Sequence, residues 1–422
     1  MRRYESYKDS SVEWLGEVPS HWNLIPNKYI FKLRKNVVGK RSSEYDLLSL
    51  SLKGVIKRDM ENPEGKFPAE FDTYQEVKEG DFIFCLFDVE ETPRTVGLSS
   101  YHGMITGAYT IFETNNVDKK FIYYFYLNLD SDKRLKPLYK GLRNTISKET
   151  FFSFNTFIPP LSEQQKIAQF LDDKTAKIDQ AMDLAEKQIA LLKEHKQILI
   201  QNAVTRGLNP DVPLKDSGVE WIGQVPEHWE ILSIKRLSQV KRGASPRPID
   251  NPKYFDNDGE YAWVRISDVT ASNMYLLETT QKLSNLGKSY SVPLMPGSLF
   301  LSIAGSVGKP IITKIKVCIH DGFVYFPEYK QNTKFLYYIF YSEQPYIGLG
   351  KMGTQLNLNT DTVGAIKIPI PPLCEQQKIA DYLDTQTAKI DQTIALKTAH
   401  IEKLKEYKSV LINDVVTGKV RV

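Results

Sequence analysis

The sequence has 422 residues, 41% of them hydrophobic, and 55 Lys and Arg against 51 Asp and Glu give a net charge of +4. This composition is typical of a globular chain with two or three cores, and no apolar run approaches the roughly 20 residues of a membrane span. Three widely spaced cysteines, Cys85, Cys318 and Cys374, form no CxxC pair and argue against disulfides and a zinc site. The start lacks an apolar leader, so we expect a cytoplasmic protein.

The first element is a polar lead-in, and the chain contains it twice. KDSSVEW at residues 8–14 returns as KDSGVEW at 215–221, and VPSHW at 18–22 returns as VPEHW at 225–229. We interpret the tryptophans as anchors of an irregular segment on a domain surface. His21 and His228 have no Cys, Asp or second His at ligand spacing, which argues against a metal site.

Each lead-in is followed by a region that predicts a mixed α/β domain. In the first, short β-rich runs at 46–52 and 82–86 predict strands, whereas the aromatic run at 121–127 fits a helix or a strand. The second has little identity with the first, but PGSLF at 296–300 corresponds to EGDFI at 79–83. The predicted boundaries are 1–22 (lead-in), 23–157 (domain 1), 158–207 (helical spacer 1), 208–229 (second lead-in), 230–369 (domain 2) and 370–422 (helical spacer 2).

Each domain ends in the same motif, IPPLSEQQKIA at 158–168 and IPPLCEQQKIA at 370–380. The paired prolines should end the preceding strand because proline lacks the N–H that a strand ladder needs. Ser162 is then the expected helix N-cap, with Gln165 completing a capping box. Apolar residues follow at alternating spacings of four and three, which predicts coiled-coil helices over about 162–204 and 374–416, each roughly 65 Å long.

The direction of helix pairing follows from two lysines. Lys196 and Lys408 occupy equivalent seam positions, so parallel pairing would place two ammonium groups side by side. We therefore expect an antiparallel pair within a pseudo-two-fold repeat. Since the lead-in that should follow the second helix stands at residues 8–22, the two termini should lie close together.

The sequence contains no complete set of catalytic residues. NPKY at 251–254 breaks the Asn/Asp-Pro-Pro-Tyr/Phe tetrad of DNA adenine methyltransferases. GSVGKP at 305–310 has the wrong spacing for a phosphate loop, and Glu194-His195-Lys196 fits a coiled-coil helix better than a nuclease site. These observations predict a non-catalytic binding protein without catalytic or metal-binding residues.

The duplicated motifs, in this order, resemble the specificity subunit of type I restriction–modification systems. KRGASPRP at 241–248 and WVRISD at 263–268 add to the resemblance, which covers essentially the whole chain. It implies two α/β (α+β) target-recognition domains, separated by two long antiparallel coiled-coil helices, that each read half of a split site in double-stranded DNA. It also implies that the helices dock two methylation subunits and that motor-nuclease restriction subunits can join. The chain itself would hold no cofactor, since S-adenosylmethionine, ATP and magnesium belong to the partner subunits.

Reading DNA requires Arg, Lys, Asn or Gln at base edges and basic or hydroxyl groups at phosphates. The candidate DNA-binding residues of the first domain are Lys53, Lys57, Arg58, Arg94, Arg143, Asn144 and Thr145. Those of the second domain are Lys241, Arg242, Ser245, Arg247, Ser306, Lys309, Lys351, Thr354, Gln355 and Asn357.

The rival interpretation is a structural adaptor that links two protein-binding domains through a coiled coil.

Overall fold

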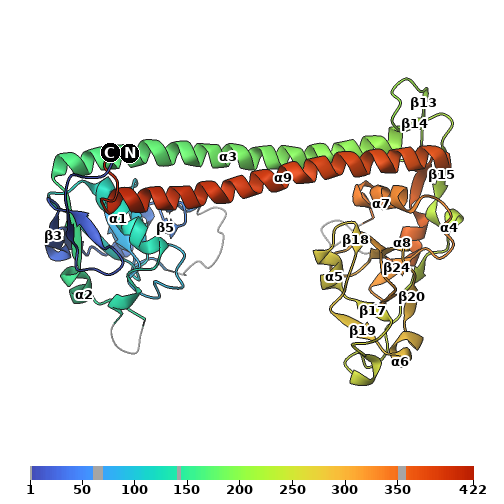
Figure 1. Cartoon of the computed structure of the whole chain (residues 1–422), viewed down its shortest axis with the longest axis horizontal. Coiled ribbons are helices and arrows are strands. Elements are labelled where there is room, and N and C mark those ends of the chain that lie inside the picture. The colour runs from blue at the N-terminus through green and yellow to red at the C-terminus, as the bar shows by residue number, and fades with distance from the viewer. Residues whose placement is uncertain (1, 60–69, 140–143, 350–357) are drawn as a thin grey trace. The chain divides into compact units, whose positions relative to one another are not determined.

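The computed structural model describes residues 2–59, 70–139, 144–349 and 358–422 (Figure 1). The chain divides into two compact units, Met1–Glu186 with Thr398–Val422, and Lys187–Lys397. Each unit contains a lead-in hairpin, an α/β body and one part of each of two long helices, α3 (Leu161–Arg206) and α9 (Leu373–Val416). The predicted fold class, with its repeated organisation, is confirmed.

The body of the first unit surrounds an aromatic core. Its strands and shorter helices are β1 (Tyr7–Asp9), β2 (Glu17–Pro19), β3 (Asn23–Pro26), β4 (Phe31–Arg34), β5 (Leu48–Ser51), β6 (Gly54–Lys57), β7 (Gln75–Val77), β8 (Phe82–Phe84), β9 (Val96–Leu98), β10 (Gly103–Ile105), β11 (Thr110–Thr114), α1 (Lys119–Ser131), α2 (Lys148–Ser153) and β12 (Asn155–Ile158). The main sheet has the order β4-β11-β8-β9 and is antiparallel throughout. Phe31, Phe84 and Phe112 pack on one another beneath it with their ring centroids 5.6–5.8 Å apart.

The second unit repeats the plan with more strands. Its elements are β13 (Leu214–Asp216), β14 (Gln224–Pro226), β15 (Glu230–Ser233), α4 (Ile234–Leu237), β16 (Lys241–Arg242), β17 (Tyr261–Val264), α5 (Ile266–Ala271), β18 (Tyr275–Leu276), β19 (Gln281–Leu283), α6 (Asn285–Ser289), β20 (Val292–Leu294), β21 (Leu299–Ser302), β22 (Pro310–Thr313), β23 (Val317–Ile319), β24 (Phe323–Tyr325), α7 (Thr333–Tyr341), α8 (Thr360–Ala365) and β25 (Lys367–Ile370). One sheet has the order β16-β24-β21-β22-β18, and the other has the order β19-β17-β23-β20.

The two bodies match strand for strand in their central sheets. The order β4-β11-β8-β9 in the first unit corresponds to β16-β24-β21-β22 in the second, and the antiparallel pair β7·β10 corresponds to β20·β23. The turns before β8 and β21 each contain a glycine in the left-handed region, Gly80 (φ +81°) and Gly297 (φ +91°), where a side chain would be strained. The correspondence of these two turns, expected from sequence, is confirmed.

The prolines act as expected, but the helix cap does not. Strands β12 and β25 end at Ile158 and Ile370, directly before the paired prolines. Ser162 was expected as the N-cap, yet α3 already begins at Leu161, so Ser162 lies inside the first turn. The carbonyl of Pro160 accepts the N–H groups of Glu163 and Gln164 instead, so the chain turns into the helix one residue earlier than predicted.

The coiled-coil seam is present in each unit. In the first, Ile178 and Ala185 of α3 are 8% and 6% exposed, and Ile401 and Leu411 of α9 are 6% and 3% exposed. In the second, Leu192 and Leu199 of α3 are half-buried, as is Ile390 of α9. The apolar spacing therefore identified the packed faces correctly.

Paired charges show that the helices run antiparallel. In the first unit Lys408 Nζ lies 2.6 and 2.7 Å from the carboxylate oxygens of Asp179. In the second unit Lys196 Nζ lies 2.8 Å from both carboxylate oxygens of Asp391. The two pairs are equivalent in the repeat, and each lysine meets an aspartate of the other helix rather than another lysine. The antiparallel prediction is confirmed.

The described ends of the chain meet. The Arg421 N–H donates to the Arg2 carbonyl oxygen at 2.8 Å, and the two residues form an antiparallel bridge (Figure 1). This contact confirms that the termini are adjacent, as the duplicated lead-in predicted.

Candidate DNA interface

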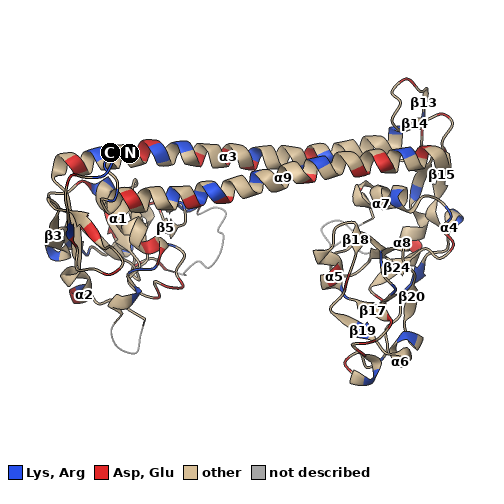
Figure 2. Cartoon of the chain, in the orientation of Figure 1, with Lys and Arg blue, Asp and Glu red and all other residues tan. Residues whose placement is uncertain are grey.

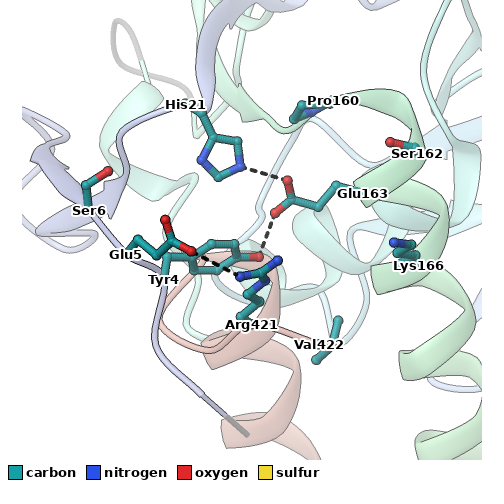
Figure 3. A pocket seen from close by; sticks show the side chains of 10 residues that line it. All are labelled: Tyr4, Glu5, Ser6, His21, Pro160, Ser162, Glu163, Lys166, Arg421 and Val422. Atoms are coloured by element: carbon teal, nitrogen blue, oxygen red, sulfur yellow. Dashed lines mark hydrogen bonds and ion pairs between the residues drawn. The ribbon is translucent and has the colours of Figure 1, made fainter.

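One glutamate fixes the first lead-in to the start of α3. Glu163 contacts His21 Nε2 at 2.7 Å and accepts the Tyr4 hydroxyl at 2.6 Å (Figure 3). It also accepts the Trp22 indole N–H at 3.1 Å. Burial and the Glu163 carboxylate raise the pKa of Tyr4 well above its usual value, so Tyr4 remains a hydrogen-bond donor. Trp22 is fully buried, and the predicted anchoring role is confirmed.

The second unit repeats this anchor. Glu375 accepts the Trp229 indole N–H at 3.0 Å and contacts His228 Nε2 at 2.8 Å. Trp229 is also fully buried. The glutamate of each EQQ motif therefore pairs with the His-Trp of the preceding lead-in, which explains why the two motifs are duplicated together.

A second anchor attaches the first body to its long helix. Asp172 of α3 accepts the Tyr124 hydroxyl at 2.8 Å and pairs with Lys120, both from α1. The Gln164 side-chain oxygen accepts the N–H of Asp118, the N-cap of α1, at 2.8 Å. Helix α1 is thereby held along α3, and it contains the whole aromatic run at 121–127 that fitted either a helix or a strand.

The second body has the same anchor on α9. Asp384 accepts the Tyr338 hydroxyl at 2.7 Å and pairs with Lys334, both from α7. The Gln376 oxygen accepts the N–H of Asn332, the N-cap of α7, at 3.0 Å. The sequence analysis missed this anchor. The repeated strings KFIYY at 120–124 and KFLYY at 334–338 are the signal that could have revealed it.

In the second body, three candidate residues converge on one turn. The Asp321 carboxylate accepts the Ser245 hydroxyl at 2.8 Å and an Arg247 N–H at 2.9 Å, and the Asp321 carbonyl accepts Arg242 Nε at 2.5 Å. Partial burial raises the pKa of Asp321, but the Ser245 hydrogen bond and the Arg247 charge outweigh it and hold the pKa below its usual value. Lys241 is exposed on the neighbouring strand β16. The structure thus collects Arg242, Ser245 and Arg247 on one surface.

Close backbone contact explains the glycine in this loop. A Cβ on Gly243 would lie 2.2 Å from the His320 carbonyl oxygen, so only glycine fits where the loop crosses the turn between β23 and β24. The same turn holds His320 in place, because the Gly322 N–H donates to His320 Nδ1 at 2.8 Å. Burial lowers the pKa of His320 and favours its neutral form.

A cavity of about 800 Å³ opens beside this turn. Its lining includes Trp263 of β17, Arg265 directly before α5, Gln281 of β19, and His320 and Asp321. The sequence analysis did not select Arg265, Gln281, His320 or Asp321 as candidate DNA-binding residues. Arg265 stood within the WVRISD motif, but nothing in the sequence indicated that these strands would bring it to Gln281.

Two basic candidates have structural contacts. Lys309 Nζ donates to the carbonyls of Thr270 and Ser272 at 2.9 and 2.7 Å, and burial lowers its pKa. Ser306 lies beside it and bonds the Thr270 hydroxyl at 2.7 Å. In the first body, Arg94 pairs with Asp130 at 3.4 Å, and its side chain is only 19% exposed. Lys309 and Arg94 therefore stabilise their own bodies, and their DNA contacts stay a prediction.

The other candidates of the first body lie at its surface. Lys53 is exposed in the β5–β6 turn, and Lys57 is exposed on β6, where it pairs with Asp46. Arg58 is half-buried, and its N–H donates to the Leu47 carbonyl. Asn144 and Thr145 are exposed. Five candidates lie outside the described residues: Arg143, Lys351, Thr354, Gln355 and Asn357.

The long helices have mixed rather than one-sided charge. Figure 2 shows Lys and Arg interspersed with Asp and Glu along both α3 and α9. This pattern is typical of solvent-exposed helix faces with ion pairs, not of a continuous basic track for phosphates. Of the helices among the described residues, none has the length and apolar character to cross a membrane.

Comparisons with known proteins agree with this architecture. The chain is 27% identical over 339 residues to the type I restriction enzyme MjaVIII specificity subunit of Methanocaldococcus jannaschii, covering 76% of this chain and 75% of that protein. It is 24% identical to the putative MjaX specificity subunit of the same organism, covering 99% of this chain and 97% of that protein.

Two solved structures share the fold. One, described as the basis of complex assembly and conformational transition of the type I R-M system, has a TM-score of 0.73 at 14% identity and covers 96% of this chain and 99% of its own. The HsdS subunit from Thermoanaerobacter tengcongensis has a TM-score of 0.55 at 14% identity, with 96% and 98% covered.

A family assignment completes the comparison. Residues 104–193 and 226–406, more than half of the chain, match the family described as the type I restriction modification DNA specificity domain. The matched ranges include both long-helix motifs and the sheets that carry the Asp321 turn. With its duplicated anchors and paired bodies, this chain belongs to the type I restriction–modification DNA specificity family.

Proposed function

We propose that this chain is the non-catalytic DNA-recognition subunit of a type I restriction–modification complex, in which each body reads one half of a bipartite site. The observation that carries the proposal is that the two bodies share their anchors and sheet order while their exposed loops differ. A shared framework with different loops is expected of two domains that read different sequences, because base readout depends on loop side chains.

The recognition surface of the second body is centred on Lys241, Arg242, Ser245 and Arg247, with the Lys351–Asn357 segment as a further candidate. Arg247 is 71% exposed even while it contacts Asp321, so its guanidinium can reach a phosphate or a base. In the first body, the exposed residues Lys53, Lys57 and Asn144 have the corresponding role.

The long helices would set the gap between the half-sites and dock two methylation subunits. In the first unit, Leu184 of α3 and Val410 of α9 are 57% and 50% exposed. In the second unit, Leu191 of α3 and Leu396 of α9 are 63% and 66% exposed. Apolar side chains on the solvent faces of paired helices are suited to partner helices, and each unit has its own set.

The partner subunits would carry out the chemistry and would bind S-adenosylmethionine, ATP and magnesium. Motor-nuclease restriction subunits can join the same complex. The free thiols Cys85, Cys318 and Cys374 suit the reducing cytoplasm, where the host DNA lies.

Filter binding to duplex DNA, with the chain alone and with its methylation partner, tests this function. Mapping of methylated adenines in the host genome should then yield one bipartite sequence. Binding to proteins without any sequence-specific DNA binding would favour a coiled-coil adaptor instead. Turnover of DNA or ATP by the purified chain without partners would contradict a non-catalytic subunit.

Within this function, Arg247→Ala should weaken binding to the cognate site about 5- to 150-fold if Arg247 contacts a base. A phosphate contact would instead weaken binding to all sequences and lower the salt dependence. Unchanged affinity and unchanged salt dependence would exclude Arg247 from the interface. Lys316→Ala, at a half-buried lysine paired with Glu260, is the control.

A further inference from the structure

We propose that Arg265 and Gln281 form a donor pair that selects a guanine in the half-site read by the second body. The proposal rests on the DNA-recognition function above and names the base that one cavity of the second body reads. It concerns residues that the sequence did not indicate and that lie next to the Arg247–Asp321 contact.

The backbone holds both residues firmly. Strands β17 and β19 are antiparallel, with Trp263 opposite Gln281, and Arg265 follows two residues after Trp263. The Arg265 N–H donates to the Asp268 carboxylate at 2.8 Å, which fixes the start of α5. The aspartate of the WVRISD motif therefore positions the arginine. A base-reading residue needs such a fixed backbone, since a mobile side chain would lose conformational entropy on binding.

The pairing of Arg265 with Gln281 leaves mainly hydrogen-bond donors on these two side chains. An Arg265 Nη2–H donates to the Gln281 side-chain oxygen. That oxygen is the main acceptor of the glutamine amide, so the groups that remain are the Gln281 NH₂ and the other N–H groups of Arg265. In the major groove, guanine presents two acceptors, N7 and O6, whereas adenine presents one acceptor and one donor. The N–H groups that remain on Arg265 and Gln281 therefore favour guanine.

His320 adds a third donor to the same cavity. Its Nδ1 accepts the Gly322 N–H, so the neutral ring carries its proton on Nε2. Trp263 packs on the His320 ring with centroids 5.8 Å apart and restricts its rotation. Arg265, Gln281 and His320 thus each present a hydrogen-bond donor.

The charge of the cavity indicates a base edge rather than a phosphate. Asp250, Asp256 and Asp321 line it together with a single guanidinium, that of Arg265. Arg247 neutralises Asp321, but Asp250 and Asp256 would repel a phosphate inside the cavity, whereas a neutral base edge has no such cost. Asp321 is already occupied by Ser245 and Arg247, and one Asp256 oxygen accepts the Asp258 N–H, which leaves Asp250 and the second Asp256 oxygen to accept the cytosine N4 amino group of the same base pair.

The test uses the full chain with its methylation subunits and maps methylated adenines genome-wide for four variants. Arg265→Ala and Arg265→Lys should each lower the preference for guanine at one position of one half-site about 10- to 100-fold. Arg265→Lys keeps the charge but loses the planar fork, so its non-specific DNA affinity should equal that of the native protein. Gln281→Ala should give a smaller loss at the same position. The other half-site is an internal reference.

Lys282→Ala is the matched control, because Lys282 neighbours Gln281 on β19 but is exposed. It should leave the recognised sequence unchanged. Melting temperatures verify that each variant is folded, and Arg265→Lys and Gln281→Ala decide the matter if Arg265→Ala does not fold. A half-site without guanine, unchanged preference in the folded Arg265 variants, or weakening that is equal for all sequences overturns the proposal. If the native complex methylates without sequence preference, the proposed function itself fails.

Discussion

The two bodies use their arginines differently on matching sheets. In the first, Arg34 of β4 pairs with Asp81 at 3.0 Å and Glu113 at 2.8 Å, within its own sheet. In the second, Arg242 of the matching strand β16 reaches across to the turn at Asp321. The matching turn of the first body, between β10 and β11, is Thr106-Gly107-Ala108-Tyr109 and has no carboxylate. The anchors on the long helices stay the same while the contacts of the exposed loops change, so attachment and recognition are separate properties of each body.

The largest expected effect comes from lengthening the helices while both bodies are left intact. One heptad added after Leu192 in α3 and after Ile394 in α9 lies between the Gln188–Lys397 and Lys196–Asp391 contacts and preserves the seam. Seven residues add about 10 Å, so the gap between half-sites should grow by about three base pairs while the half-sites stay the same.

Methylation-site mapping measures this change. The DNA also twists by about a third of a turn over three base pairs, so binding should weaken as the gap grows. An unchanged gap, or altered half-sites, would show that the helices do not determine the spacing. Substituting exposed residues at the same places, without insertion, is the control.

The next largest effect is the loss of stability when one lead-in anchor is removed, and this loss should be equal in the two units. Trp22→Ala and Trp229→Ala each remove a fully buried indole that donates to a glutamate, and each should lower the free energy of unfolding by about 3–5 kcal/mol. Chemical denaturation of the full chain measures both. Trp14→Ala and Trp221→Ala, at half-buried positions, should cost less. A large loss in only one unit would break the equivalence of the anchors.

A smaller effect is the pH dependence of the Lys196–Asp391 pair in the seam. Burial lowers the pKa of Lys196, but the Asp391 hydrogen bond and Tyr341 outweigh it, so its pKa in the folded protein lies above the usual 10.5. The Lys196 contribution is therefore fully present below pH 10.5 and is lost as the pH rises through the folded pKa. Lys196→Met should cost about 0.5–1 kcal/mol at pH 8, and the difference from the native chain should shrink above pH 10.5. A difference that grows with pH would contradict this assignment.

The smallest expected effect is none. The backbones of Arg2 and Arg421 already form a bridge. A chain in which residue 422 is joined to residue 1 by a short linker and which is opened near Asn209 should therefore still fold and recognise the same DNA. Circular dichroism and methylation mapping of the permuted chain measure this. The control is the native chain with the same linker inserted at Asn209. If this control folds and the permuted chain does not, the lead-in must precede the first body in the sequence for the chain to fold.

The sequence predicts the parts of this fold that repeat or follow a period. Heptad spacing identified the seam, and the equivalent positions of Lys196 and Lys408 indicated its direction. The aromatic run at 121–127 was ambiguous because Phe121, Ile122, Tyr124, Phe125 and Tyr126 are all buried, so no polar face marks the helical period.

The recognition surface was harder to predict for a different reason. Arg94 and Lys309 have the residue types of a DNA contact, but each is partly buried against groups distant in sequence, Asp130 and the Thr270 carbonyl. Asp321 collects residues 74 to 79 positions away. Residue type alone cannot distinguish a basic side chain that faces solvent from one that bonds groups of its own domain, since long-range packing decides which occurs.

The duplicated Lys–Asp pair has a consequence for how the chain pairs with itself. Asp179 precedes Lys196 by the same interval that separates Asp391 from Lys408, so each long helix is complementary to its own sequence read in the opposite direction. The seam is therefore an isologous interface contained in one polypeptide. These two charge pairs alone do not distinguish α9 from a second copy of α3, whereas covalent linkage favours α9 because it gives the two helices a high effective concentration.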